Sequence, residues 1–75
     1  MNASSRPQGN IARLHTDWEE INGELRRMEQ VLSDAIGLYL RGQTGKPAYA
    51  IAEVERLRAL CGERFDALMQ AIRDA

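Results

Sequence analysis

Residues 41–47 read RGQTGKP, and this stretch divides the chain into two long patterns of apolar residues. Gly42 can end a first helix, because helices commonly end at a residue in the left-handed conformation that glycine adopts without strain. Gly45 adds a second flexible point. Pro47 suits the first turn of a new helix because its φ angle is already fixed. The stretch therefore predicts a turn over residues 42–46 between two helices.

The letters GQTGK in this turn also match the end of a phosphate-binding loop, which reads G-x-x-x-x-G-K-[ST] after a strand. With Gly45 and Lys46 aligned, Leu40 takes the place of the first glycine and Pro47 that of the Mg²⁺-binding Ser or Thr. The preceding run has helical periodicity, and Pro47 has no N–H to offer a phosphate. The pattern favours a turn over a nucleotide site, so we expect no cofactor.

Before the turn, apolar residues recur at alternating steps of three and four, which predicts a helix over residues 10–41. Such a helix carries one apolar seam along its length and packs lengthwise on a partner. Residues 1–9 are polar and predict a disordered, mobile tail. The seam consists of Ile11, Leu14, Trp18, Ile21, Leu25, Met28, Leu32, Ala35 and Tyr39.

Two positions are candidate N-caps of this first helix. Thr16 with Glu19 matches a capping box, whereas Asn10 directly precedes the first seam residue. Because Ile11 and Leu14 already belong to the seam, we expect the helix to begin near Asn10.

After the turn, a second apolar pattern predicts a helix over residues 47–74. Two consecutive steps of four meet at Cys61, and Gly62 follows directly. A glycine inside a helix costs about 1 kcal/mol relative to alanine. We therefore expect either a bend at Gly62 or a neighbouring helix that approaches it closely. The stripe consists of Ala50, Val54, Leu57, Cys61, Phe65, Leu68 and Ile72.

Two helices of similar length with a short connection predict an all-α fold, a long antiparallel two-helix hairpin. With the turn centred near residue 44, the numbers of facing residues should add up to about 88–90. Trp18 should then lie near Ile72. Ile11 and Leu14 should extend to or beyond the end of the second helix, with little cover from it.

The apolar stripes are wider than one partner helix covers, because Val31, Ile36 and Leu38 flank the first seam. A chain of 75 residues also has a small core, and such domains often gain stability by oligomerising. We therefore expect two copies to form a four-helix bundle. The expected oligomer and partner interface consists of Ile11, Leu14, Trp18, Ile21, Leu25, Met28, Leu32, Phe65, Leu68 and Ile72.

Few side chains in the sequence suggest chemistry. Cys61 is the only cysteine and His15 the only histidine. Cys61 lies on the apolar stripe, which is typical of a small buried hydrophobe. His15 stands four residues before Glu19, with which it can form a weak ion pair. No Glu-x-x-His spacing of a di-iron bundle is present. We expect no catalytic site, no metal site and no enzymatic activity.

Charge and hydropathy bear on partners and location. Ten basic and eleven acidic residues give a net charge of −1, so the chain has no strongly basic balance of the kind that binds nucleic acid. Arg26 and Arg27 also have Glu24 and Glu29 nearby. No apolar run reaches the length of about 18 residues that suggests a membrane span. The polar N-terminus does not resemble a secretory signal, so we expect a cytoplasmic protein that makes no membrane contact.

The sequence favours a small non-enzymatic protein–protein interaction or regulatory module that acts as a helical homo-oligomer, with a dimer favoured. Its working surface would be the oligomer interface and the N-terminal end around Ile11, Leu14 and Trp18, since tryptophan is common at interfacial hot spots. Two alternatives stay open: a small nucleic-acid-associated regulator, and a non-catalytic subunit of a larger assembly. No motif in the chain selects among the known classes of helical hairpin.

Overall fold

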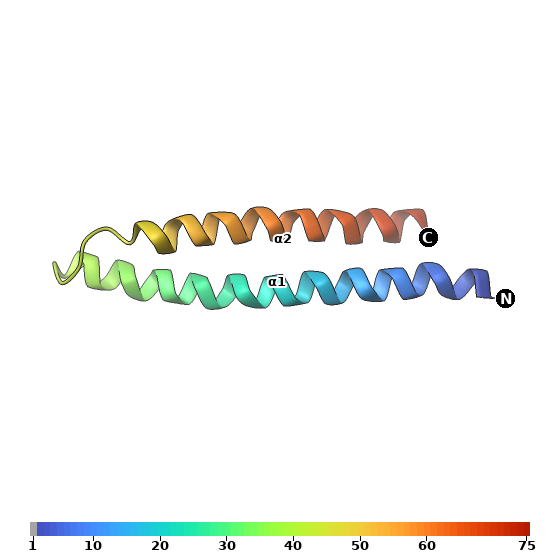
Figure 1. The fold of residues 1–75 in the computed structure, drawn as a ribbon, viewed down its shortest axis with the longest axis horizontal. Coiled ribbons are helices and arrows are strands. Elements are labelled where there is room, and N and C mark those ends of the chain that lie inside the picture. The colour runs from blue at the N-terminus through green and yellow to red at the C-terminus, as the bar shows by residue number, and fades with distance from the viewer. Residues whose placement is uncertain (1) are drawn as a thin grey trace.

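The protein is a rod made of two antiparallel helices. A computed structural model describes the backbone of residues 2–75 and the side chains of residues 9–75. Helix α1 spans Asn2–Leu40, and helix α2 spans Ala48–Asp74. Helix α2 lies beside α1 over its whole length, α1 extends beyond the end of α2, and the molecule measures 63 × 14 × 13 Å (Figure 1). The predicted all-α helical hairpin is confirmed.

Helix α1 begins earlier than the sequence suggested. Asn10 and Thr16, the two candidate caps, both lie inside the helix. The Thr16 hydroxyl donates a hydrogen bond of 3.1 Å to the backbone carbonyl four residues before it, as threonine does within helices. The sequence predicted a mobile tail over residues 1–9. Because the side chains of residues 1–8 lie outside the described part of the chain, this stays a prediction.

Gly42 ends α1. It has a φ of +75°, and it is the one position between residues 2 and 75 with a positive φ. The Gly42 N–H donates to the Tyr39 carbonyl at 3.0 Å, and the Gln43 N–H donates to the Leu38 carbonyl at 2.9 Å. These are the two hydrogen bonds of a Schellman motif, which satisfies carbonyls at the end of a helix and needs a left-handed residue at this position.

Pro47 stands one residue before α2 rather than in its first turn. Its φ of −80° and ψ of 58° are those of an inverse γ-turn. The Ala48 N–H closes this turn by donating to the Lys46 carbonyl at 2.8 Å. The Pro47 carbonyl accepts a hydrogen bond of 3.0 Å from the Ile51 N–H, which starts the helical pattern. Pro47 therefore turns the chain into α2 and caps it.

The register of the two helices differs from the sequence expectation. The connection runs back beside the end of α1 before α2 begins (Figure 1). Non-helical chain covers more length per residue than a helix does, so each residue of α2 lies further along α1 than a symmetric turn would place it. Trp18 accordingly packs against Phe65 instead of Ile72, with 6.1 Å between the ring centroids.

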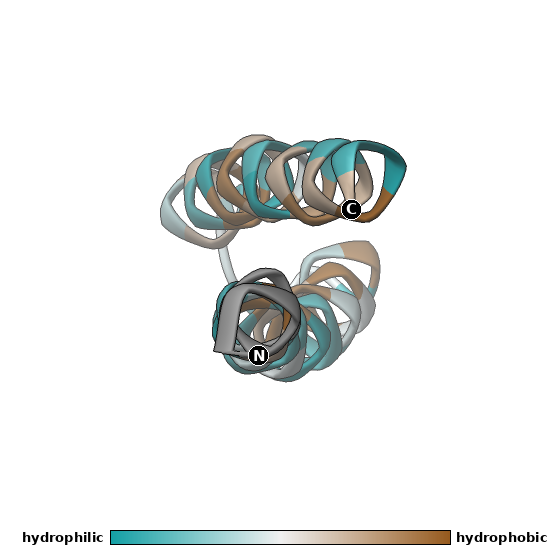
Figure 2. Cartoon of the chain, turned by 90° about the vertical axis from the view of Figure 1, so that its right-hand side faces the viewer, coloured by the Kyte–Doolittle hydropathy of each residue, from teal (hydrophilic) through white to brown (hydrophobic). Residues whose placement is uncertain are grey.

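The core between the helices is small. Five apolar side chains are buried, and Val54 is the least exposed at 2%. Viewed along the rod, apolar segments of both helices gather where the helices face each other (Figure 2). None of the buried side chains between residues 9 and 75 is polar. The five buried residues are Ile21, Ala50, Val54, Leu57 and Leu68.

The seam of α2 is more regular than the sequence stripe suggested. Phe65 and Ile72 are exposed, whereas Arg64 and Ala71 are half-buried and continue the seam. The steps then alternate between four and three, so the expected irregularity at Cys61 disappears. A strict seven-residue repeat keeps facing a partner helix, and here that spacing outweighs the preference for the larger apolar side chains.

Gly62 lies on the outer surface of α2, which runs unbroken through it. A Cβ atom added at Gly62 would meet no atom within 4 Å. The expected close approach of a neighbouring helix is therefore wrong for the single chain. Position 62 has room for a larger side chain and gains nothing from glycine's conformational freedom.

The two glycines make a matched test of these backbone assignments. Gly62→Ala should raise the free energy of unfolding by about 1 kcal/mol, because alanine is the better helix former. Gly42→Ala should lower it by about 1–2 kcal/mol, because the left-handed conformation strains a residue with a Cβ atom. Urea unfolding of both variants and the native chain at one protein concentration measures the difference. A loss of stability in Gly62→Ala would contradict the open surface assigned to that position.

Candidate interaction surface

One side of the hairpin is identified by an ion pair between the helices. Arg58 Nη2 lies 2.9 Å from Glu29 Oε2, so these two residues flank the seam on the same side of the rod. In a coiled coil, residues seven apart on one helix lie on the same side. The residues seven or fourteen positions away from Glu29 on α1 and from Arg58 on α2 therefore lie on this side as well. We call this side the apolar face. It consists of His15, Asn22, Glu29 and Ile36 on α1 and Ile51, Arg58, Phe65 and Ile72 on α2.

The large side chains of the apolar face are open to solvent in the single chain. Ile36 and Ile51 are 40% and 41% exposed, and Phe65 and Ile72 are 44% and 48% exposed. In a two-stranded coil the positions beside the seam are commonly charged, whereas a wider apolar stripe needs a further neighbour to cover it. The hairpin thus leaves half-covered apolar side chains along one face.

Trp18 fills the end of the apolar face that lies away from the loop. Its ring is half-buried, tilted by 55° against Phe65 and stacked at 26° on His15, with 6.1 Å between centroids in both pairs. Aromatic rings at this separation attract one another beyond the area they bury. His15 Nδ1 also lies 3.6 Å from Glu19 Oε1, the pair that the sequence suggested. Trp18 therefore joins the seam to the exposed face.

The Glu29–Arg58 pair interrupts the apolar side chains between the loop end and the aromatic end. Arg58 Nε and Nη2 both donate to Glu29 Oε2, at 3.2 and 2.9 Å. The side chains of Arg58 and Glu29 are 63% and 39% exposed, and such open pairs contribute about 0–1 kcal/mol. The pair matters more for where it places two opposite charges than for the stability of the hairpin.

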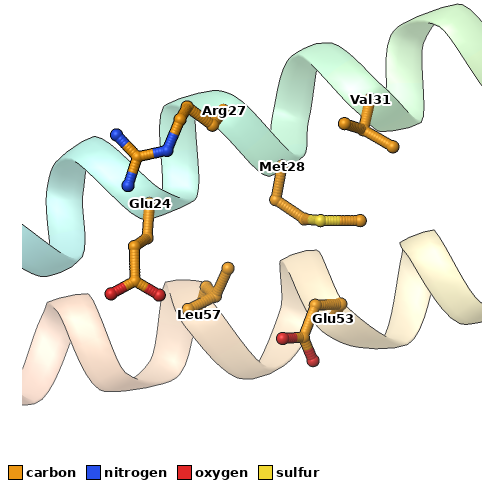
Figure 3. A pocket seen from close by; sticks show the side chains of 6 residues that line it. All are labelled: Glu24, Arg27, Met28, Val31, Glu53 and Leu57. Atoms are coloured by element: carbon orange, nitrogen blue, oxygen red, sulfur yellow. The ribbon is translucent and has the colours of Figure 1, made fainter.

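The other side of the rod carries carboxylates. Glu24, Glu53 and Arg27 line a shallow open groove with Val31 between the helices (Figure 3). Arg56 Nη2 donates to Glu53 Oε2 at 2.7 Å, and this hydrogen bond lowers the pKa of Glu53 below its usual value. We call this the acidic side. At seven-residue spacing it consists of Asp17, Glu24, Val31 and Leu38 on α1 and Glu53, Leu60, Ala67 and Asp74 on α2.

The loop end exposes further apolar groups. Leu40 and Tyr49 are each 76% exposed, and Tyr39 is 40% exposed. The sequence predicted that this half of α1 is covered by more than one helix, and α2 alone leaves it open. Cover of this end by another chain stays a prediction.

The predicted interface residues separate into three groups. Ile21 and Leu68 are buried between α1 and α2, whereas Phe65 and Ile72 are exposed on the apolar face. Six are half-buried along the seam, so they serve the contact within the chain, and their part in an oligomer stays a prediction. These six are Ile11, Leu14, Trp18, Leu25, Met28 and Leu32.

Ile11 and Leu14 have more cover than the sequence suggested. Both are half-buried, because the register places the end of α2 beside them. The expectation that they lie almost uncovered is therefore wrong. The register had been derived from a symmetric turn, and the observed connection is not symmetric.

Sequence reasoning missed the pairing of Glu29 with Arg58 and the role of Ile51. The signal that could have found this face is the spacing of Ile51, Arg58, Phe65 and Ile72, each seven residues from the next. It was hidden because Phe65 and Ile72 were assigned to the seam itself.

The remaining candidate chemistry is sparse in residues 9–75. Cys61 is a free, half-buried thiol, and its Sγ lies 3.9 Å from Asn22 Oδ1. Across this part of the chain, no group of three or more His, Cys, Asp or Glu side chains is placed to hold a metal ion. Neither helix, over the residues described, is long and apolar enough to cross a membrane.

Comparisons with known proteins identify no relative. No known protein family matches the chain, and neither a curated protein nor a solved structure is significantly similar to it. Function must therefore be inferred from the surface of the chain itself.

Two leucines test the distinction between seam and surface. Leu57 is 3% exposed and Leu40 is 76% exposed. Leu57→Ala should lower the free energy of unfolding by about 2–5 kcal/mol, because it leaves a cavity between the helices. Leu40→Ala should change it by less than about 0.5 kcal/mol. Circular dichroism during urea unfolding measures both, and equal losses would contradict the assigned seam.

Proposed function

We propose that the chain is a small, cytoplasmic, non-enzymatic module for protein–protein interaction or regulation, and that it works as a helical homodimer. The observation that supports this is the set of apolar side chains left open along the apolar face. Ile36, Ile51, Phe65 and Ile72 are each at least 40% exposed. Exposed apolar groups gathered on one face of a small protein are typical of surfaces at which proteins associate.

The size of the core supports the same proposal. A hairpin buries one contact between two helices, and five buried side chains are a small core for 75 residues. Domains of this size without disulfides or metals often rely on association for stability. Each square ångström of apolar surface removed from water contributes about 25 cal/mol, so covering the apolar face stabilises the dimer and the fold of each chain together.

A net charge of −1 and the pairing of two arginines within the chain favour protein contact over nucleic acid. Arg58 is paired with Glu29 and Arg56 with Glu53, so both guanidinium groups are already neutralised within the chain. Phosphate binding depends on clusters of uncompensated Lys and Arg.

Cys61 is a free thiol, which fits the reducing compartment proposed for the module.

Light scattering coupled to size exclusion tests the proposed dimer. At micromolar concentrations we expect twice the chain mass of 8.4 kDa. We also expect the melting temperature to rise with protein concentration, because association stabilises the folded chains by mass action.

A mass of one chain at every concentration, with a melting temperature independent of concentration, would contradict the proposed homodimer. The apolar face would then have to be covered by a different protein, as in a non-catalytic subunit of a larger assembly.

A further inference from the structure

We infer that the second copy packs on the apolar face, with the loops of both copies at the same end and a two-fold axis parallel to the helices. This inference rests on the proposed homodimer and adds the face and the orientation. It places Glu29 of each copy over Arg58 of the other. The alternatives are the acidic side and an arrangement with the loops at opposite ends.

The charges of the two sides select the face. A two-fold interface brings a surface patch against its own copy, so a patch must complement itself. The acidic side has four carboxylates at its seven-residue spacing and only two arginines, Arg27 and Arg56, beside them, so two copies joined there would bring an excess of negative charge together. Like charges placed together in an interface cost several kcal/mol. The apolar face pairs one Glu with one Arg, and its other positions hold four large apolar side chains together with the polar His15 and Asn22. Only the apolar face is self-complementary in charge.

The ion pair also selects the orientation. When the two-fold axis runs parallel to the helices, α1 of each copy lies over α2 of the other. Glu29 then meets Arg58 of the second copy, and Ile36 meets Ile51 of the second copy. All neighbouring helices are antiparallel, as in four-helix bundles of the up-and-down type. The two intrachain pairs become an alternating ring of four charges.

An axis perpendicular to the helices gives poorer contacts at the same positions. It lays α1 on α1 and α2 on α2, with the loops at opposite ends. Centred on the ion pair, it brings Arg58 against Arg58 and Glu29 against Glu29. When this axis is shifted so that the apolar faces of the two copies overlap fully, Arg58 lies against Phe65 of the second copy and Glu29 lies against its Asn22. Neither placement gives the two charges a new opposite partner, which buried or half-buried charges need.

The face can be tested with two substitutions of matched exposure on α1. Ile36 lies on the apolar face and is 40% exposed, and Val31 lies on the acidic side and is 50% exposed. Ile36→Glu should raise the dissociation constant of the dimer by at least about a hundredfold, because it buries an unpaired carboxylate twice per dimer. Val31→Glu should leave it within about threefold, as surface changes usually do.

Sedimentation equilibrium measures these dissociation constants, and circular dichroism confirms that each variant is still helical. Equal weakening by both substitutions, or weakening by Val31→Glu alone, would overturn the assignment of the apolar face. The native chain measured alongside reports on the homodimer itself, so a monomeric native chain is the separate failure of the proposed function.

Disulfide trapping distinguishes the two orientations. In a Cys61→Ala background, one preparation carries Ile36→Cys and another Ile51→Cys, and the two are mixed before mild oxidation. Because each chain then holds one cysteine, any bond between them joins two copies. With the loops at the same end, we expect a mixed disulfide dimer as the main product. Size exclusion before oxidation confirms that each preparation is still dimeric.

Two matched controls mix Ile51→Cys chains with Phe65→Cys chains and with Ile72→Cys chains, since these positions meet only when the loops lie at opposite ends. A disulfide in either control mixture and none in the first mixture would overturn the inferred orientation. No disulfide in any of the three mixtures, from preparations that are dimeric, would overturn the inferred face while leaving the homodimer intact.

Discussion

Helices α1 and α2 pack along a seam that repeats every seven residues, and that repeat decides which side chains remain outside it. On α2 it takes Arg64 and Ala71 into the contact, although Phe65 and Ile72 are larger and more apolar. A helix that followed the larger side chains would drift away from its partner after Cys61. Keeping the two antiparallel helices in contact along their length therefore leaves two large apolar side chains, Phe65 and Ile72, on the surface.

The displaced residues give the rod two unlike sides. Phe65 and Ile72 lie in line with Ile51, and Arg58 among them meets Glu29 across the seam. The opposite flank receives Glu24 and Glu53 instead. A hairpin with equal flanks would offer a second chain no preference, whereas the two sides of this one differ in charge, and the dimer that we infer depends on that difference. The interaction surface is thus a consequence of how the seam is filled.

The two helices, their antiparallel arrangement and the glycine that ends α1 follow from the sequence because each depends on local pattern. Gly42 needs only a helix before it and room for a positive φ. The register does not follow in the same way. It depends on how far the connection runs back along α1, and that is set by the inverse γ-turn at Pro47, which the letters alone do not specify. The error in register then placed Trp18 beside Ile72, whereas the assignment of Phe65 and Ile72 to the seam hid the apolar face.

The stretch RGQTGKP therefore governs the interaction surface as well as the fold. A slide of α2 by one heptad would keep apolar residues facing apolar residues along the seam, because the seam repeats. It would, however, bring Arg58 beside Asn22 or Ile36 in place of Glu29. The charges of Arg58 and Glu29 would then be unpaired within the chain. The Gly42 cap and the turn at Pro47 place α2 in the register that both fills the seam and pairs Glu29 with Arg58.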